Sequence, residues 1–228
     1  DYSQVELRIL AHLSQDEGLL QAFRRDEDVH ISTAATIFGV PPSEVTPAMR
    51  GIAKTTNYAI VYGISGFGLA ARTELSPQEA QQFIQSYFEK YPGVKRYLDS
   101  TKEMARTKGY VETLLGRRRY FPELQSRGGT FNMRQAAERM AINAPVQGTS
   151  ADIMKMAMIR VFAEMKRRRL KSRMILQVHD ELVFEAPDVE VETLAPLAHE
   201  VMCNAYTLDA PLAVEVKAGP NWEEMDEV

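Results

Sequence analysis

The sequence has a single cysteine, Cys203, and lacks the features of a membrane or secreted protein. One cysteine excludes an internal disulfide and a cysteine-based zinc site. No apolar run approaches the roughly 20 residues that a membrane span requires. The charged, polar opening of the chain does not have the pattern of a signal peptide. We therefore expect a cytoplasmic protein that does not associate with membranes.

Positive charge is not in excess either. The 27 Lys and Arg residues are outnumbered by 31 Asp and Glu residues, which gives a formal net charge of −4. A uniformly basic nucleic-acid-binding protein is excluded, although local basic clusters can still bind phosphates. One cluster, 166–169, lies at the end of a predicted helix, where cations suit the helix dipole, and we interpret it as a solvated helix end. The other, 117–119, lies between Gly116 and Tyr120 and is more typical of a shaped contact loop, for which phosphate contact remains open.

Repeats and low-complexity segments are absent from the sequence, and the 45% apolar content suffices for a core. Helix signals dominate the first half. Thr46-Pro47 is an N-cap followed by proline at the first helical position. It predicts a helix from Pro47 to Tyr62 that stops at Gly63. Residues 76–79 form a capping box that starts another helix. Pro145, inside a long helical region, predicts a kink or a boundary.

Strand patterns lie mainly in the second half. Short strands are predicted at 110–115 and 119–121, a strand–turn–strand unit at 173–186, and a final strand at 211–217. Helices first, and then helices mixed with an antiparallel sheet, indicate an α+β fold. The order predicts a helical subdomain inserted into a sheet-based one.

The helix that begins at Pro47 carries a stripe of charged and aromatic side chains. Arg50, Lys54, Tyr58 and Tyr62 recur every four residues and therefore share one face. The two cations lie near the helix N-terminus, the positive end of the dipole, where anions bind readily. A nucleoside triphosphate along this face would place its phosphates near the cations and its base near the rings. A solvated cationic face beside two core aromatics explains the same spacing.

Two aspartates far apart in the sequence are candidates for binding a metal. Asp1 opens the chain, and Asp180 interrupts an apolar run between Val178 and Leu182. A carboxylate between buried strands needs a partner, and a divalent metal is one. Oxygen ligands favour magnesium or manganese over zinc. Metal-binding carboxylates, phosphate-binding cations and rings that stack on a base are what nucleotidyl transfer requires.

Three segments together resemble the signature motifs of family A DNA polymerases, the bacterial polymerase I type. Residues 1–8, Asp-Tyr-Ser-Gln-Val-Glu-Leu-Arg, resemble motif A; 50–63 resemble motif B and 178–181 motif C. A fourth segment, 138–149, resembles the one that contacts the minor groove and the primer end. The motifs occur in the family's order, and the similarity covers essentially the whole chain. The resemblance implies a DNA-directed DNA polymerase acting on primer–template DNA and dNTPs.

The resemblance assigns roles to individual residues. Asp1 and Asp180 would bind two Mg²⁺ ions, for which Mn²⁺ can substitute, and the Tyr2 carbonyl would help to hold one of them. Lys54 and Glu181 would join the two aspartates as catalytic residues. The residues implied to contact the nucleotide are Arg50, Lys54, Tyr58, Tyr62, His30, Glu6 and Gln4, and those implied to contact DNA are Arg139, Asn143, Gln147 and His179.

Within this set, Glu6 would be the steric gate against a ribose 2′-hydroxyl. Three positions depart from the family pattern. Tyr58 replaces a phenylalanine found in many members, which implies ready acceptance of dideoxynucleotides because its hydroxyl can stand in for the missing 3′-hydroxyl. Gly51 replaces a frequent arginine and weakens the helix by about 1 kcal/mol. Ala59 replaces the usual glycine.

The resemblance also predicts subdomain boundaries: palm at 1–14, fingers at 15–128 and palm again at 129–228. The palm sheet would be incomplete, because the thumb, part of the palm and the exonuclease-type domain that precede motif A in the family are absent from this sequence. We therefore expect a segment of a larger bacterial, nucleoid-associated enzyme. Its partner would be the rest of the polymerase chain, and it would be nearly inactive alone.

Two alternative functions remain. A single-subunit RNA polymerase shares the metal-binding aspartates and a lysine and tyrosine of the fingers helix. A gate at Glu6 against the 2′-hydroxyl would be self-defeating in such an enzyme. A non-catalytic DNA-binding remnant would have no need of Asp1, Asp180 and Lys54 together. Ribonucleotide incorporation after Glu6→Ala, and metal-dependent turnover abolished by Asp180→Asn, distinguish these alternatives.

Overall fold

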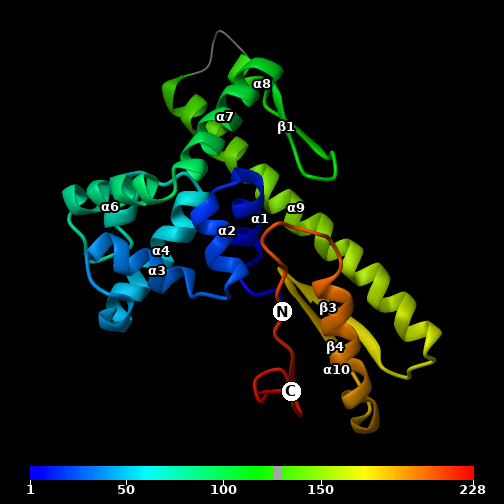
Figure 1. Ribbon diagram of the computed structural model, residues 1–228. Coiled ribbons are helices and arrows are strands. Elements are labelled where there is room, and N and C mark those ends of the chain that lie inside the picture. The colour runs from blue at the N-terminus through cyan, green and yellow to red at the C-terminus, as the bar shows by residue number, and fades with distance from the viewer. Residues whose placement is uncertain (126–129) are drawn as a thin grey trace.

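The computed structural model describes residues 1–125 and 130–228, and its parts are arranged around one long helix, α9, Phe131–Arg167 (Figure 1). The helices of the first half form a lobe on one side of α9. A β-hairpin, α10 and the C-terminal segment lie toward its other end. Helices with small antiparallel sheets make up the described residues, so the predicted α+β class is confirmed.

The helical lobe is built from short helices joined by tight connections. They are α1 (Val5–Ser14), α2 (Glu17–Arg24), α3 (Val29–Phe38), the 3-10 turn η1 (Pro42–Glu44), α4 (Pro47–Val61), α5 (Gly66–Ala70), α6 (Pro77–Lys90), α7 (Pro92–Lys108) and α8 (Pro122–Gln125). After α9 the chain forms α10, Asp188–Cys203.

Local capping signals set the ends of the helix predicted from Pro47, which is α4. The Thr46 side chain accepts a hydrogen bond from the Met49 N–H, and Pro47 occupies the first helical position. Gly63 follows the helix with a φ of 65°, and a Cβ there would lie 2.5 Å from Ile142 Cδ1. Glycine therefore both ends α4 and lets it approach α9 closely. The capping box between Ser76 and Glu79 is also present, at the start of α6.

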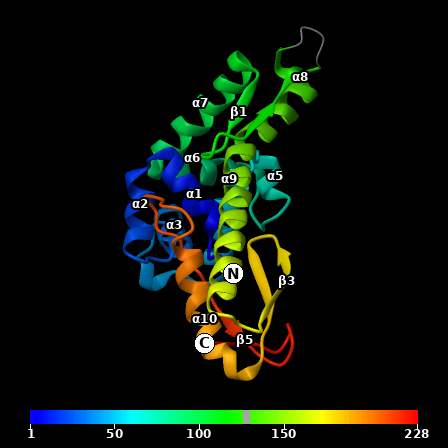
Figure 2. The same cartoon turned by 90° about the vertical axis from the view of Figure 1, so that its right-hand side faces the viewer.

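The strands form three separate antiparallel pairs. β1 (Tyr110–Glu112) pairs with β2 (Arg118–Tyr120), β3 (Arg173–Val178) with β4 (Glu181–Glu185), and β5 (Lys217–Ala218) with β6 (Asp226–Glu227). In Figure 2 the β3–β4 hairpin and α10 lie on either side of the lower half of α9.

One sequence-based expectation, the final strand, needs correction, and of the two outcomes predicted for Pro145 the boundary is absent. Helix α9 continues through Pro145 without a boundary. Because Pro145 and its neighbour Val146 are buried, packing around the helix compensates for the one hydrogen bond that proline removes. The final strand predicted at 211–217 is reduced to an isolated bridge between Val214 and Tyr2, followed by the short β5. Its pairing is divided, because 213–215 pair with residues 1–3 while Val216 and β5 pair with 226–228, so the described residues do not form one continuous ladder.

The main core fills the space between α1, α2, α7, α9 and α10, and a smaller one joins α4, α5 and α6. A third lies beneath the β1–β2 hairpin, around Val111 and Phe121. Among the described residues, no helix combines the length and the apolar character needed to cross a membrane. The smaller core makes the α4–α6 region a packing unit of its own, attached to α9 through the main core.

Candidate active site

The first three residues lie between the β3–β4 hairpin and the segment before β5. The Tyr2 N–H donates to the Asp180 carbonyl at 3.0 Å, and the Ser3 N–H donates to the Ala213 carbonyl at 2.9 Å. The Tyr2 ring is buried, and its hydroxyl donates to the Met202 carbonyl at 2.8 Å. Tyr2 therefore anchors the start of the chain. It places Asp1 and Asp180 on adjacent backbone segments, although 178 residues separate them in sequence.

Asp180 lies in the two-residue turn that joins β3 and β4. Val178 pairs with Glu181 across the turn, and His179 has a φ of 51°. Within the part of the chain that the structure describes, neither the Asp180 nor the Asp1 carboxylate makes a hydrogen bond or an ion pair. Such oxygens suit a hard divalent cation, and the Tyr2 backbone lies beside them. No group of three or more His, Cys, Asp or Glu side chains that could hold a metal converges among those residues.

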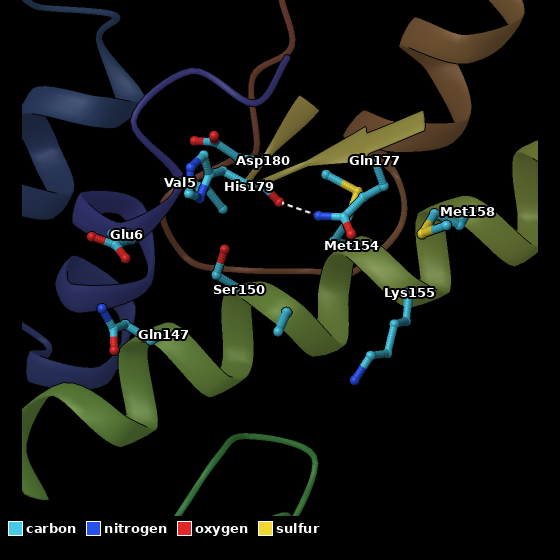
Figure 3. Close-up of a pocket in the computed structure, with 11 residues that line it drawn as sticks. Val5, Glu6, Gln147, Ser150, Met154, Lys155, Met158, Gln177, His179 and Asp180 are labelled. Atoms are coloured by element: carbon cyan, nitrogen blue, oxygen red, sulfur yellow. Dashed lines mark hydrogen bonds between the residues drawn. The ribbon is translucent and has the colours of Figure 1, made fainter. Parts of the chain in front are cut away.

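A cleft of about 300 Å³ opens beside the Asp180 turn. Figure 3 shows Glu6 of α1, Gln147 and Ser150 of α9, and His179 and Asp180 of the turn around it. Four of these five residues belong to the set predicted from the sequence. The fold therefore gathers side chains of the motif A, motif C and α9 segments around one space.

The aromatic end of α4 contacts Glu6, one of the residues that line this cleft. The Tyr62 hydroxyl donates to Glu6 Oε2 at 2.7 Å. Burial, the hydrogen bond to Glu6 and its charge raise the pKa of Tyr62 to about 12, while a hydrogen bond with Gln147 opposes them. Burial also raises the pKa of Tyr58, and the charges of Glu6 and Asp180 raise it further. The two tyrosines therefore lie near carboxylates of both the α1 and the hairpin segments.

The cationic end of α4 is tied to α3. Arg50 Nε donates to Asp28 Oδ2 at 2.8 Å, while Asp28 also caps α3 by accepting from the His30 and Ile31 N–H groups. Burial raises the pKa of Asp28, but these hydrogen bonds outweigh it and the net shift is downward. Lys54 is exposed, and no hydrogen bond or ion pair engages its ammonium group within the described ranges.

His30 is buried beneath this pair, with only 2% of its surface exposed. Its Nδ1 lies 2.8 Å from Asn57 Nδ2, and its ring centroid lies 5.9 Å from that of Tyr58. Burial lowers the pKa of His30 to about 4; Asp28 opposes the shift, and Arg50 and Lys54 add to it. The imidazole is therefore neutral at pH 7.

Arg139, Asn143 and Gln147 recur every four residues along α9 and share one of its faces. Arg139 and Gln147 are exposed.

Two amide oxygens of the predicted set, Asn143 Oδ1 and Gln4 Oε1, are buried without a hydrogen-bond partner within the described ranges. Gln4 has the left-handed φ of 55° and does not cap α1 with its side chain. Orphaned buried acceptors of this kind need a ligand, a water or a rearrangement to satisfy them.

The arginine cluster at 117–119 has partners within the protein. Arg117 makes two hydrogen bonds to the buried Asp152 of α9, at 2.9 and 2.7 Å, and Arg118 pairs with Glu112 at 3.0 Å. The Arg119 guanidinium lies 5.4 Å from the centre of the Phe121 ring. Arg117 therefore fixes the β1–β2 hairpin to α9. Sequence reasoning did not predict this role, because it depends on Asp152, 35 residues further along the chain.

Other partners were also missed. Asp28 could have been recognised as the N-cap of α3, since it directly precedes Val29-His30, but its bond to Arg50 joins two separate helices. Trp222, the only tryptophan, donates its indole N–H to Glu181 Oε1 at 2.9 Å. No local pattern signals that contact.

Comparison with known proteins identifies relatives. The family model described as DNA polymerase family A matches residues 1–224. DNA polymerase I of Bacillus caldotenax is 54% identical over 222 residues, which cover 97% of this chain and 25% of that protein. The thermostable DNA polymerase I of Thermus thermophilus is 50% identical over 222 residues, covering 97% of this chain and 26% of that protein. The chain thus spans about a quarter of the length of these curated relatives.

A solved structure is also similar. It is described as the POL domain of Pol1 from M. smegmatis in complex with DNA primer–template and dNTP. The match has a TM-score of 0.87 and 49% sequence identity, and it covers 93% of this chain and 37% of that one. The arrangement of α4, α9 and the β3–β4 hairpin is therefore shared with a polymerase domain over nearly the full length of this chain.

Proposed function

Because the chain belongs to DNA polymerase family A, we propose that it forms the fingers and most of the palm of a DNA-directed DNA polymerase. It would help to transfer a deoxynucleoside monophosphate from a dNTP to a primer 3′ end. The observation that carries the proposal is the hydrogen bond from Tyr2 to Asp180, which holds the motif A and motif C aspartates on neighbouring segments beside the cleft. The similar solved structure contains primer–template DNA and dNTP.

The proposed palm comprises 1–14 and 129–228, and the proposed fingers comprise 15–128. The separate small core of α4, α5 and α6 supports a distinct fingers unit. The pairing of the first residues with the hairpin and with 213–215 supports one palm made of both chain ends. The rest of the polymerase chain, including a thumb, would complete the DNA-binding cleft. The 228-residue chain alone would extend primers weakly or not at all, and the enzyme would work at the bacterial nucleoid.

The donor set at the Asp180 turn fits divalent metal. Asp1 and Asp180 would hold the ions together with the Tyr2 carbonyl, and both carboxylates lack a partner among the described residues. Mg²⁺ is the hard cation that prefers such oxygens, and Mn²⁺ would substitute for it. When bound, two such ions would stabilise the attacking and leaving oxygens of the phosphoryl transfer. Glu181 adds negative charge beside them.

The α4 face would bind the nucleotide. Arg50 and Lys54 would hold the triphosphate, with His30 behind them as a neutral hydrogen-bonding group. Charge-assisted hydrogen bonds to phosphate are strong, so each cation contributes to both binding and orientation. Because Arg50 is paired with Asp28, the triphosphate must displace or share that carboxylate. Lys54 has no such competitor in the described part of the chain and is the cation most available for the leaving pyrophosphate.

The sugar and base would lie against Tyr58 and Tyr62. The bond between Tyr62 and Glu6 fixes the Glu6 carboxylate at the edge of the cleft, which supports its role as a gate against a 2′-hydroxyl. Gln4 lies at the start of α1, the helix that carries Glu6. Its buried Oε1 has no hydrogen-bond partner among the described residues, which supports a role in nucleotide contact. A gate of this kind favours a DNA polymerase over an RNA polymerase.

The primer–template would lie along α9 and the hairpin turn. Arg139, Asn143 and Gln147 line one face of that helix, and amide and guanidinium groups suit the acceptors of the minor groove. His179 borders the cleft next to Asp180, where a primer terminus would end. Arg139 is the one cation of the three α9 residues, so the contact is compatible with the net charge of −4.

Primer extension by the polymerase that contains this segment tests the proposal. Asp180→Asn should reduce the Mg²⁺-dependent rate by about a thousandfold, because metal stabilisation of transition-state charge is worth several kcal/mol. Asp99→Asn, which alters an exposed carboxylate on α7, is the matched control and should retain the rate. Extension by the Asp180 variant at the wild-type rate would refute the assignment.

A further inference from the structure

The side chain of Glu181 turns toward the C-terminal segment. Its Oε1 accepts a hydrogen bond from Trp222 Nε1 at 2.9 Å. An indole N–H is a donor only, and a hydrogen bond to an ionised carboxylate is stronger than a neutral one. Half of the Trp222 surface is exposed, so the ring is not there simply to fill a core. The contact therefore fixes the direction of the Glu181 carboxylate.

The loop that carries Trp222 is itself held in place. β5 and β6 pair on either side of it, with Lys217 opposite Glu227. Inside the loop, the Asn221 side chain accepts hydrogen bonds from the Glu223 and Glu224 N–H groups, at 3.0 and 3.1 Å. Trp222 is therefore presented from an internally bonded turn.

Glu181 lies next to the candidate metal site but does not join it. It directly follows Asp180 in sequence. Glu181 pairs with Val178 across the turn, and the Tyr2 N–H donates to the Asp180 carbonyl at 3.0 Å. Glu181 is thus next in sequence to the residue whose backbone joins the hairpin to the Asp1–Tyr2 segment. Yet no three acidic or other metal-binding side chains converge in the described residues.

We propose that Trp222 is a positioning residue that holds the Glu181 carboxylate away from the ions bound by Asp1 and Asp180. This inference rests on the proposed function. Magnesium accepts six ligands in a strict octahedron. A third carboxylate would occupy a position that the triphosphate or the primer 3′-oxygen needs, and its charge would hold the ion more tightly. By engaging Glu181, the Trp222 N–H keeps that position open while the carboxylate's charge stays nearby.

Mn²⁺ binding to the polymerase that contains this segment, followed by the electron paramagnetic resonance signal of the free ion, tests this inference without an activity assay. Trp222→Phe keeps an aromatic ring but removes the donor. It should bind Mn²⁺ about three- to tenfold more tightly than wild type, because one more carboxylate becomes a ligand. Adding Glu181→Gln to that variant should remove the gain. Equal or weaker binding by a Trp222→Phe chain with wild-type circular dichroism overturns the inference.

Glu181→Gln alone gives a second test that leaves the tryptophan in place. Because Glu181 is not a ligand in the wild-type chain, this variant should bind Mn²⁺ within about twofold of wild type. A loss of tenfold or more would make Glu181 a ligand and overturn the inference.

Asp180→Asn separates the positioning role from the proposed metal site. If the Asp180 variant no longer binds Mn²⁺ and the Trp222→Phe variant binds it no more tightly than wild type, only the positioning role fails. If the Asp180 variant binds Mn²⁺ like wild type, the metal site and the positioning role both fail.

Discussion

Helix α4 and the β3–β4 hairpin differ in how their charged groups are partnered. On α4, Arg50 is paired with Asp28, and Tyr62 is bonded to Glu6, while His30 beneath them contacts Asn57. At the hairpin, no protein partner engages the Asp1 and Asp180 carboxylates within the described ranges. This difference in partners indicates how each region would bind its ligand. Under the proposed function, the Asp1 and Asp180 carboxylates would receive cations directly, whereas most of the α4 groups would have to exchange an existing partner before they could hold a nucleotide.

Unlike Arg50 and Tyr62 on the same face of α4, Lys54 has no hydrogen-bond or ion-pair partner among the described residues. Substituting Lys54 therefore gives the sharpest test of the difference between partnered and unpartnered groups. In the polymerase that contains this segment, Lys54→Ala should lower kcat/KM for dNTP by a factor of about 10 to 100. This range corresponds to one charge-assisted hydrogen bond. Arg50→Ala should have a smaller effect on kcat/KM, because the wild-type Arg50 must first leave Asp28. A larger loss for Arg50→Ala than for Lys54→Ala would break the comparison.

Asp28→Asn tests the competition directly. Asparagine caps a helix about as well as aspartate, so α3 should remain intact. With the carboxylate charge removed, Arg50 should bind triphosphate more readily, and the KM for dNTP should fall by about two- to fivefold, the range expected for one partly exposed ion pair. The measurement is steady-state primer extension. Asp99→Asn serves as the control for a neutralised surface carboxylate, and a raised KM in the Asp28 variant would contradict the account.

Tyr58→Phe tests whether the tyrosine hydroxyl serves the nucleotide. The account predicts that wild type accepts dideoxynucleotides readily. The variant should discriminate against them at least about five- to tenfold more strongly, the worth of one hydrogen bond. Competition between deoxy- and dideoxynucleotides in primer extension measures this ratio. Strong discrimination by the wild-type enzyme would show that the hydroxyl does not replace the missing 3′-hydroxyl.

The smallest predicted effect is on the pH dependence of the protein's folding stability. Because burial lowers the pKa of His30 from 6.5 to about 4, the unfolded chain binds its proton before the folded chain does as the pH falls. Stability from this group is complete above pH 6.5 and is lost between pH 6.5 and about 4. His30→Gln should flatten the pH dependence of the melting temperature in that window. The exposed His199→Gln should leave it unchanged, and an equal slope in both variants would exclude a buried, neutral His30.

The sequence predicted the elements whose signals are local. The N-cap at Thr46, the glycine at 63 and the capping box at Ser76 each set a helix end within a few residues, and the structure has all three. The predicted cleft residues Glu6, Gln147, His179 and Asp180 also meet. Their convergence could be anticipated only through resemblance to a known family, because local signals do not encode which distant segments pair.

Non-local pairing explains what the sequence did not reveal. The partner of Arg50 is on another helix, and the partner of Glu181 is 41 residues away in the C-terminal loop. Pro145 was expected to produce a kink or a boundary, and the boundary did not occur because tertiary packing overrides a single lost hydrogen bond. The strand expected at 211–217 did not form as one element, because its backbone pairing is divided between residues 1–3 and the segment 226–228.

The central claim is that Asp1 and Asp180 share divalent metal. Anomalous diffraction from crystals of the polymerase soaked with Mn²⁺ and dNTP tests it most directly. The account predicts manganese peaks about 2 Å from carboxylate oxygens of both aspartates, the distance typical of small hard cations, with the Glu181 carboxylate still on Trp222. Full manganese occupancy elsewhere, with no peak between the two aspartates, would contradict it.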